Sequence, residues 1–150
     1  MRYASGMSAH SPSEPPSPRP APDGWALRPL PDSFGDTAGP YYFRLPGPIP
    51  GVGFYSETRH RNLANFVHGG ALLSLADMAL FDICHRARGA FRAVTVSLSS
   101  EFLAPAPIGA FIEATGEMMG GGKSLLFSRG MVSANGRALL SFSGTLKVIG

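Results

Sequence analysis

Hydrophobic residues are densest in the segment NFVHGGALLSLADMALFDICHRA, residues 65–87. They cover most of the circumference of a helix, which predicts a helix from about Gly69 to Arg86 that other elements surround. At 1.5 Å per residue this helix would be roughly 27 Å long. One acid, Asp77, lies within this apolar run, where a carboxylate is costly unless a neighbouring group or a reaction requires it.

Beyond Gly89 the hydrophobic period changes to two, which indicates β-strands. Four strands are predicted, over residues 93–103, 110–119, 124–134 and 137–149, separated by PAPIG, GGGK and the turn Asn135-Gly136. In the first strand, alternation places one set of side chains on one face (Val94, Val96, Leu98, Ser100 and Phe102) and a second set on the other (Thr95, Ser97, Ser99 and Glu101).

Two shorter extended segments, YYFRL at 41–45 and GVGFYSETR at 51–59, precede the helix. Together the elements predict an α+β fold in which an antiparallel sheet curls around one long buried helix. Residues 1–35 are rich in Pro and Ser and are predicted to be a disordered tail, with the domain at 36–150. A proline-rich docking peptide is the functional alternative for the tail.

Composition narrows the classes of function. Hydrophobic residues make up 44% of the chain, and the formal net charge of +3 comes from scattered basic residues, which disfavours a nucleic-acid partner. The first twenty residues lack the apolar segment of a secretory signal, and no stretch of about eighteen apolar residues suggests a membrane span. Cys84 is the single cysteine, which fits a reducing compartment. We therefore expect a cytoplasmic protein.

Most of the candidate chemistry lies at the start and in the middle of the apolar run. Backbone N–H groups at Gly69 and Gly70 would form an oxyanion site at the helix N-terminus, or the glycines simply permit a tight turn into a buried helix. His68 is a candidate ligand, base or helix cap, without a second His or Cys at metal-ligand spacing, so no metal is expected. Burial would raise the pKa of Asp77 toward general-base work. Lys123, in GGGK, is a candidate phosphate contact, although GGGK lacks P-loop spacing.

A resemblance joins these features. Asn62, His68-Gly69-Gly70, Asp77 and Ala79, followed by VTVSLSSEFLAPAPIG, resemble the hotdog-fold acyl-CoA thioesterases of the PaaI-like, phenylacetate-degradation type within the hydroxybenzoyl-CoA thioesterase superfamily. The likeness covers about residues 41–149. It implies a hotdog fold and a thioesterase that hydrolyses an aryl, short- or medium-chain acyl-CoA to free acid and CoA, without a separate cofactor.

The resemblance also assigns roles residue by residue. It implies that Asp77 is the base or nucleophile, that the Gly69 N–H polarises the thioester carbonyl, and that Asn62 lies beside that carbonyl. Thr95 would hold the water near the acid, and His68 would shape the loop. Gly70 and Lys123 are expected on the coenzyme A side. Many relatives have Gly where this chain has Asn65, and Asn tolerates left-handed backbone better than other non-Gly residues.

Helix geometry predicts an oligomer. Gly69 and Asp77 are eight positions apart, about 12 Å along the axis, whereas a base must lie within about 3 Å of the water it activates. The two residues of one chain therefore cannot act on one thioester, which predicts a homodimer with shared active sites. The resemblance implies the same dimer, and a dimer of such dimers. Two other classes stay open: a non-catalytic acyl-CoA-binding hotdog protein, and a hotdog enoyl-CoA hydratase or dehydratase.

Overall fold

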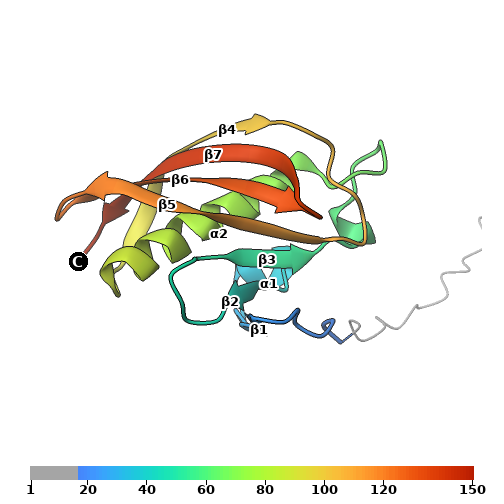
Figure 1. The fold of residues 1–150 in the computed structure, drawn as a ribbon, viewed down its shortest axis with the longest axis horizontal. Coiled ribbons are helices and arrows are strands. Elements are labelled where there is room, and N and C mark those ends of the chain that lie inside the picture. Colours follow the sequence, from blue (N-terminus) through green and yellow to red (C-terminus); the bar gives the residue numbers. More distant parts are fainter. Residues whose placement is uncertain (1–16) are drawn as a thin grey trace, which may run out of the picture.

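The computed structural model describes residues 17–150 as one antiparallel sheet curled around a long helix (Figure 1). The elements in chain order are β1 (Trp25–Leu27), α1 (Phe34–Ala38), β2 (Tyr42–Arg44), β3 (Val52–Tyr55), the 3-10 helix η1 (Thr58–His60), α2 (Gly69–Arg88), β4 (Ala93–Phe102), β5 (Phe111–Gly121), β6 (Leu125–Ala134) and β7 (Arg137–Val148). The strand order in the sheet is β1-β2-β3-β5-β6-β7-β4. The predicted α+β class is confirmed.

The core lies between α2 and the concave face of the sheet. The fully buried side chains of the helix (Leu72, Leu75, Ala76, Ala79, Leu80, Ile83 and Cys84) pack against inward residues of the strands (Val52, Phe54, Ile112, Leu126, Leu140 and Leu146). Gly144 in β7 permits this close packing, because a Cβ there would overlap the side chain of Leu80. The predicted helix and the four long strands are confirmed to within a few residues at each end.

Strands that follow one another in the sequence are not always neighbours in the sheet. β4 pairs with β7 and not with β5, so β4 forms one edge of the sheet. β1 forms the other edge. The hydrophobic pattern predicted the strands but carried no information on their order, because periodicity reports which face a residue occupies and not which strand lies beside it.

The predicted faces of β4 are wrong in its first half. Thr95 pairs with Leu146 and Ser97 pairs with Thr145, so Val96 is an extra residue in a β-bulge. The bulge shifts the alternation, and Thr95 faces the helix together with Leu98. Val94 and Val96 are instead 49% and 60% exposed. A bulge bends the strand and redirects side chains, which simple alternation cannot anticipate.

The predicted tail also differs from the structure. Within the expected disordered segment 1–35, residues 25–27 form β1, which pairs with β2, and α1 begins at Phe34. Ser33 caps α1 by accepting a hydrogen bond from the Asp36 N–H. The ordered chain thus extends N-terminal to the expected boundary, because strand pairing supplies partners that composition does not reveal. Residues 1–16 of the expected tail lie outside the described residues.

Candidate active site

The N-terminus of α2 presents one free backbone donor. His68 is the N-cap, and its Nδ1 accepts from the Gly70 N–H at 2.9 Å, while its carbonyl accepts from the Ala71 N–H at 2.9 Å. Within residues 17–150, the Gly69 N–H has no hydrogen-bond partner. His68 therefore acts as a cap that occupies the Gly70 donor and leaves the Gly69 donor at the positive end of the helix dipole.

Asn62 belongs to a tight loop that ends at this helix. Its Oδ1 accepts from the Ala64 and Phe66 N–H groups at 2.9 and 3.0 Å. Because both partners are donors, the amide orientation is determined, and Nδ2 makes no hydrogen bond within residues 17–150. Asn65 has φ of 67°, which confirms that asparagine supports left-handed backbone at this position. The loop thus uses the oxygen of Asn62 for its own structure and leaves the NH₂ group for a ligand.

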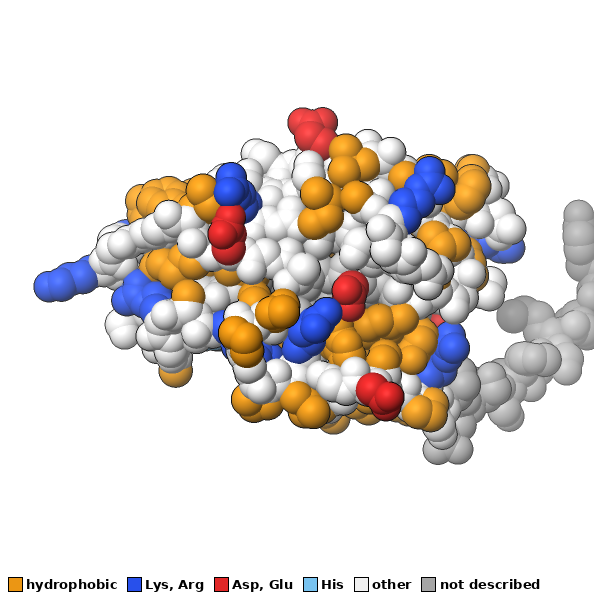
Figure 2. Space-filling model, in the orientation of Figure 1, with side chains coloured by type: hydrophobic (Ala, Val, Ile, Leu, Met, Phe, Trp, Pro, Cys, Tyr) orange, Lys and Arg blue, Asp and Glu red, His pale blue; other side chains and the backbone are white. Residues whose placement is uncertain are grey.

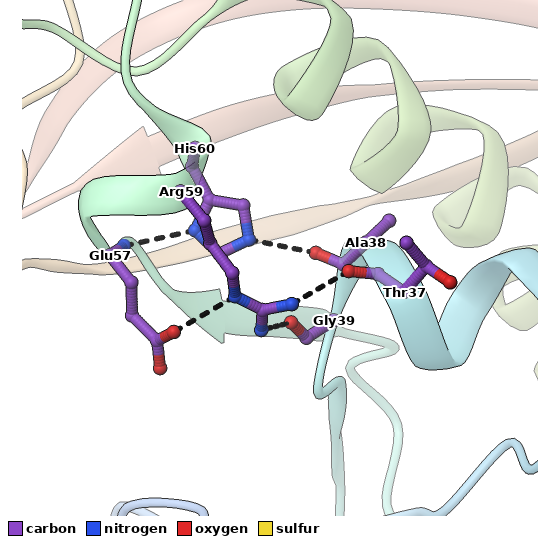
Figure 3. A network of polar contacts seen from close by, with 6 residues as sticks. All are labelled: Thr37, Ala38, Gly39, Glu57, Arg59 and His60. Atoms are coloured by element: carbon purple, nitrogen blue, oxygen red, sulfur yellow. Dashed lines mark hydrogen bonds and ion pairs between the residues drawn. The ribbon is translucent and has the colours of Figure 1, made fainter. Parts of the chain in front are cut away.

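A buried histidine holds this loop in place (Figure 3). The His60 carbonyl accepts from the His68 N–H at 2.7 Å, which ties the helix cap to η1. His60 Nδ1 accepts from the Glu57 N–H and Nε2 donates to the Ala38 carbonyl, each at 2.9 Å, which defines a neutral ring with the proton on Nε2. Burial lowers the pKa of His60. The ring also packs edge to face against Phe54, with the ring centroids 4.9 Å apart.

Arg59 adds a second set of contacts to the same junction. Its guanidinium donates to the carbonyls of Thr37, at 2.7 Å, and Gly39, and to Glu57 at 3.0 Å (Figure 3). Arg59 and His60 together bind three consecutive carbonyls at the end of α1. The segment just before β2 is therefore fastened to the loop that carries the start of α2.

An aromatic ring covers Gly69. A Cβ at Gly69 would lie 3.0 Å from Cζ of Phe102, the last residue of β4, whose side chain is 55% exposed. Phe102, Asn62 and Gly69 line the same pocket of about 400 Å³, which residues 103–106 also line. The free N–H of Gly69 and the amide of Asn62 thus share one pocket beside an exposed aromatic side chain.

Asp77 and Thr95 form the second group. Thr95 Oγ1 on β4 donates a hydrogen bond at 2.6 Å to Oδ1 of Asp77, which lies near the middle of α2. Asp77 is only partly buried in the single chain, so the full burial expected from its apolar neighbours in sequence is not found. Burial, with a smaller contribution from the charge of Asp77, raises the pKa of Tyr41 to about 12, so a neutral phenol lies near this acid.

One chain therefore holds the predicted residues in two separate groups. Asn62, His68, Gly69 and Gly70 meet at the start of α2, and Asp77 lies about 12 Å along the helix axis from Gly69. Lys123 joins neither group: the adjacent Gly122 carbonyl accepts from Arg88 at the far end of α2. Lys123 itself is exposed.

Sequence reasoning missed three residues at these groups. The sequence pattern assigns Phe102 only to a strand face and Tyr41 only to an extended segment, and it does not single out His60. The one signal available for Phe102 was an aromatic residue at the end of a strand just before PAPIG. The positions of Tyr41 and His60 depend on contacts between α1, η1 and α2, which lie far apart in sequence.

Two further features of the described residues concern metal ions and membranes. Among residues 17–150, no group of three or more His, Cys, Asp and Glu side chains is placed to hold a metal ion. The described helices include none with the length and hydrophobicity needed to cross a membrane.

Comparison with known proteins identifies related folds. A family model described as the thioesterase superfamily matches residues 64–141, slightly more than half of the chain. No curated protein sequence matches significantly. Among solved structures, zebrafish thioesterase superfamily member 2 is 25% identical, with a TM-score of 0.66 over 79% of this chain and 89% of the other.

Two bacterial structures share the fold at lower identity. The Escherichia coli PaaI protein, from the phenylacetic acid degradation operon, is 22% identical, with a TM-score of 0.70 over 79% of this chain and 86% of the other. A hypothetical thioesterase from Streptococcus pneumoniae, solved with coenzyme A, is 19% identical, with a TM-score of 0.66 over 76% and 90%. The sheet curled around α2 is thus the hotdog arrangement of PaaI-like structures.

Proposed function

The chain belongs to the thioesterase superfamily, and from that premise we propose that it hydrolyses an acyl-CoA, with an aryl, short- or medium-chain acyl group, to the free acid and CoA. The observation that carries the proposal is the unpaired Gly69 N–H at the start of α2, in one pocket with the Asn62 amide. Two donors on residues that line one pocket suit a thioester carbonyl, whose oxygen gains negative charge during attack.

In the proposed reaction, the thioester oxygen accepts hydrogen bonds from the Gly69 N–H and Asn62 Nδ2. Asp77 removes a proton from water, and the resulting hydroxide attacks the carbonyl carbon. The tetrahedral oxyanion collapses, the carbon–sulfur bond breaks, and the CoA thiolate takes up the proton. Thr95 supports Asp77 as the base, because its hydrogen bond at 2.6 Å holds one carboxylate oxygen and leaves the other for water. Direct attack by Asp77 is the alternative route to the same products.

The site requires two chains. The separation of Gly69 and Asp77 along α2 supports a homodimer in which each site combines Asn62 and Gly69 of one chain with Asp77 and Thr95 of the other. β4 supports the same proposal, since it is an edge strand of the sheet formed by residues 17–150 and carries the exposed Val94 and Val96. Two such dimers would pair in a tetramer. The second chain would also supply the burial that Asp77 lacks in the single chain.

The coenzyme A part of the substrate is also proposed to contact more than one chain. The structure from Streptococcus pneumoniae contains coenzyme A, and we carry this ligand to the present chain as part of its substrate. Lys123 is exposed in the β5–β6 turn and is available to a phosphate, although it lies away from the pocket at Gly69 within one chain. It is proposed as a nucleotide contact only from a neighbouring chain.

A panel of acyl-CoAs assayed with a thiol-trapping dye tests the proposal. Release of free CoA from aryl, short-chain or medium-chain substrates is the expected result, and the most active member identifies the acyl group. Binding of acyl-CoA without thiol release from any member would indicate a non-catalytic acyl-CoA-binding protein. Hydration of an enoyl-CoA with the thioester intact would indicate a hydratase, and either result would reject the proposal.

A further inference from the structure

The convex face of the sheet carries a cluster of aromatic rings. Alternation along the paired strands places Trp25, Tyr42, Tyr55 and Phe111 on the face that points away from α2. The rings pack edge to face, with centroid distances of 5.0 Å for Trp25–Phe111, 4.9 Å for Tyr55–Phe111 and 5.6 Å for Tyr42–Tyr55. Figure 2 shows hydrophobic side chains gathered over this part of the sheet, with basic and acidic side chains beside them.

Residues 19–22, with the sequence Arg-Pro-Ala-Pro, lie against this cluster. The Tyr42 hydroxyl donates to the Arg19 carbonyl at 2.5 Å, and the Tyr55 hydroxyl donates to the Pro20 carbonyl at 3.3 Å. The Arg19 guanidinium lies 3.9 Å from the centre of the Tyr55 ring and also donates to the Gly109 carbonyl at 3.3 Å. Backbone and side chain of the segment are therefore both recognised.

These contacts match the way proteins bind extended proline-rich segments. Proline lacks an N–H, so such a segment offers carbonyl acceptors, and aromatic hydroxyls are suitable donors. A cation over a tyrosine ring adds attraction and fixes the direction of the chain. Proline also restricts the free segment, so less conformational entropy is lost on binding.

We propose that the convex aromatic cluster is a recognition site for an extended Arg-Pro segment, and that residues 19–22 of the same chain are its resident ligand. The site lies on the face of the sheet opposite α2, so it is distinct from the proposed active site and does not depend on the proposed reaction. It fastens the N-terminal segment to the domain ahead of β1. A proline-rich docking peptide is thus present, and its partner is the domain itself.

The test uses the full chain with two anchors removed, Arg19→Ala combined with Tyr42→Phe. Trp25 is the single tryptophan, so its emission reports on the cluster. We expect the emission to change in the double variant and not in Arg137→Ala, which removes one positive charge from the exposed start of β7. A labelled Ser-Pro-Arg-Pro-Ala-Pro-Asp-Gly peptide should bind Arg19→Ala, which keeps Tyr42, at least about tenfold more tightly than wild type, because the wild-type site is already filled at high effective concentration.

The outcomes separate the proposal from its rivals. The same peptide with Ala in place of Arg should not bind Arg19→Ala. Unchanged Trp25 emission in the double variant, or equal peptide binding by wild type and Arg19→Ala, would overturn the proposal. A Trp25 signal of the wild type that depended on protein concentration would show that the segment of a second copy occupies the site, which would overturn its assignment within one chain.

Discussion

Thr95 Oγ1 donates a hydrogen bond to Asp77 Oδ1 at 2.6 Å, joining an edge strand to the middle of the central helix. The contact exists because the bulge at Val96 turns Thr95 toward the helix while Leu98 keeps its inward position. A threonine hydroxyl that donates to a carboxylate limits the rotation of that carboxylate. Asp77 is therefore held in one orientation, and its other oxygen accepts no hydrogen bond from residues 17–150.

Replacing Asp77 by Asn tests its proposed role. Asn keeps an oxygen that accepts from Thr95, so the melting temperature should change little, but it cannot take a proton from water. Turnover should fall by about 10²–10⁴-fold, the range for a lost acid–base group. Steady-state assays and thermal unfolding measure both effects, with Thr95→Ser as the control that retains the hydroxyl. An Asp77→Asn enzyme within about threefold of wild type would remove Asp77 from the mechanism.

Asn62→Asp separates the structural oxygen of Asn62 from its proposed catalytic NH₂. A carboxylate still accepts from the Ala64 and Phe66 N–H groups, so the loop should persist. The donor to the thioester oxygen is lost, and a negative charge replaces it beside the developing oxyanion. We expect turnover to fall by at least about 10²-fold, as for other lost oxyanion donors, with little change in melting temperature. Full activity in a folded Asn62→Asp protein would exclude that donor role.

Complementation tests the shared site. Asn62→Ala and Asp77→Ala chains, each inactive alone, should regain activity when they are co-expressed or refolded together. A mixed dimer contains one site with both wild-type residues and one site with neither. Random pairing makes half of the dimers mixed, so recovered activity should approach roughly a quarter of wild type.

The control for this experiment is a mixture of the two folded variants without subunit exchange, which should remain inactive. Mixed dimers are verified by different affinity tags on the two chains. Verified mixed dimers without activity would show that each site is built within one chain.

The lowered pKa of His60 predicts that the stability of the fold depends on pH. Burial lowers its pKa below the ordinary value of 6.5, so the folded chain binds fewer protons than the unfolded chain between those two values. The contribution of the neutral His60 to the free energy of unfolding should therefore be fully present above about pH 6.5. It should decrease as the pH falls from there through the lowered pKa of His60 in the folded chain. Protonation would also place a proton on Nδ1, where the Glu57 N–H now donates.

Urea unfolding of wild type and His60→Gln between pH 7.5 and 5.5 measures this dependence. The difference in stability between the two proteins should be largest at the higher pH and smaller at the lower, because only wild type loses the contribution of the neutral ring. A constant difference across this range would contradict the assignment. Since the His60 carbonyl binds the His68 N–H, the same variant should also lower turnover at neutral pH.

The local pattern of hydrophobic and polar residues was sufficient to predict the long helix and the long strands. The apolar circumference of residues 69–86 identified α2, and alternation identified β5, β6 and β7, because these signals depend on neighbouring residues in the chain. The family resemblance added Asn62, Gly69, Asp77 and Thr95 as one set. Their roles remain proposals, but the structure groups them in two pairs, Asn62 with Gly69 and Asp77 with Thr95.

Tertiary structure decided what alternation had assigned wrongly. Sequence placed Thr95 on the face opposite Leu98, and only the pairing of β4 with β7 created the bulge that brings both to the helix. Composition likewise assigned residues 19–27 to a disordered tail, whereas aromatic side chains from β2 and β3 hold Arg19 and Pro20, and β2 pairs with β1. Periodicity depends on adjacent residues, but a bulge or a bound segment depends on partners tens of residues away, and those partners exist only once the sheet has formed.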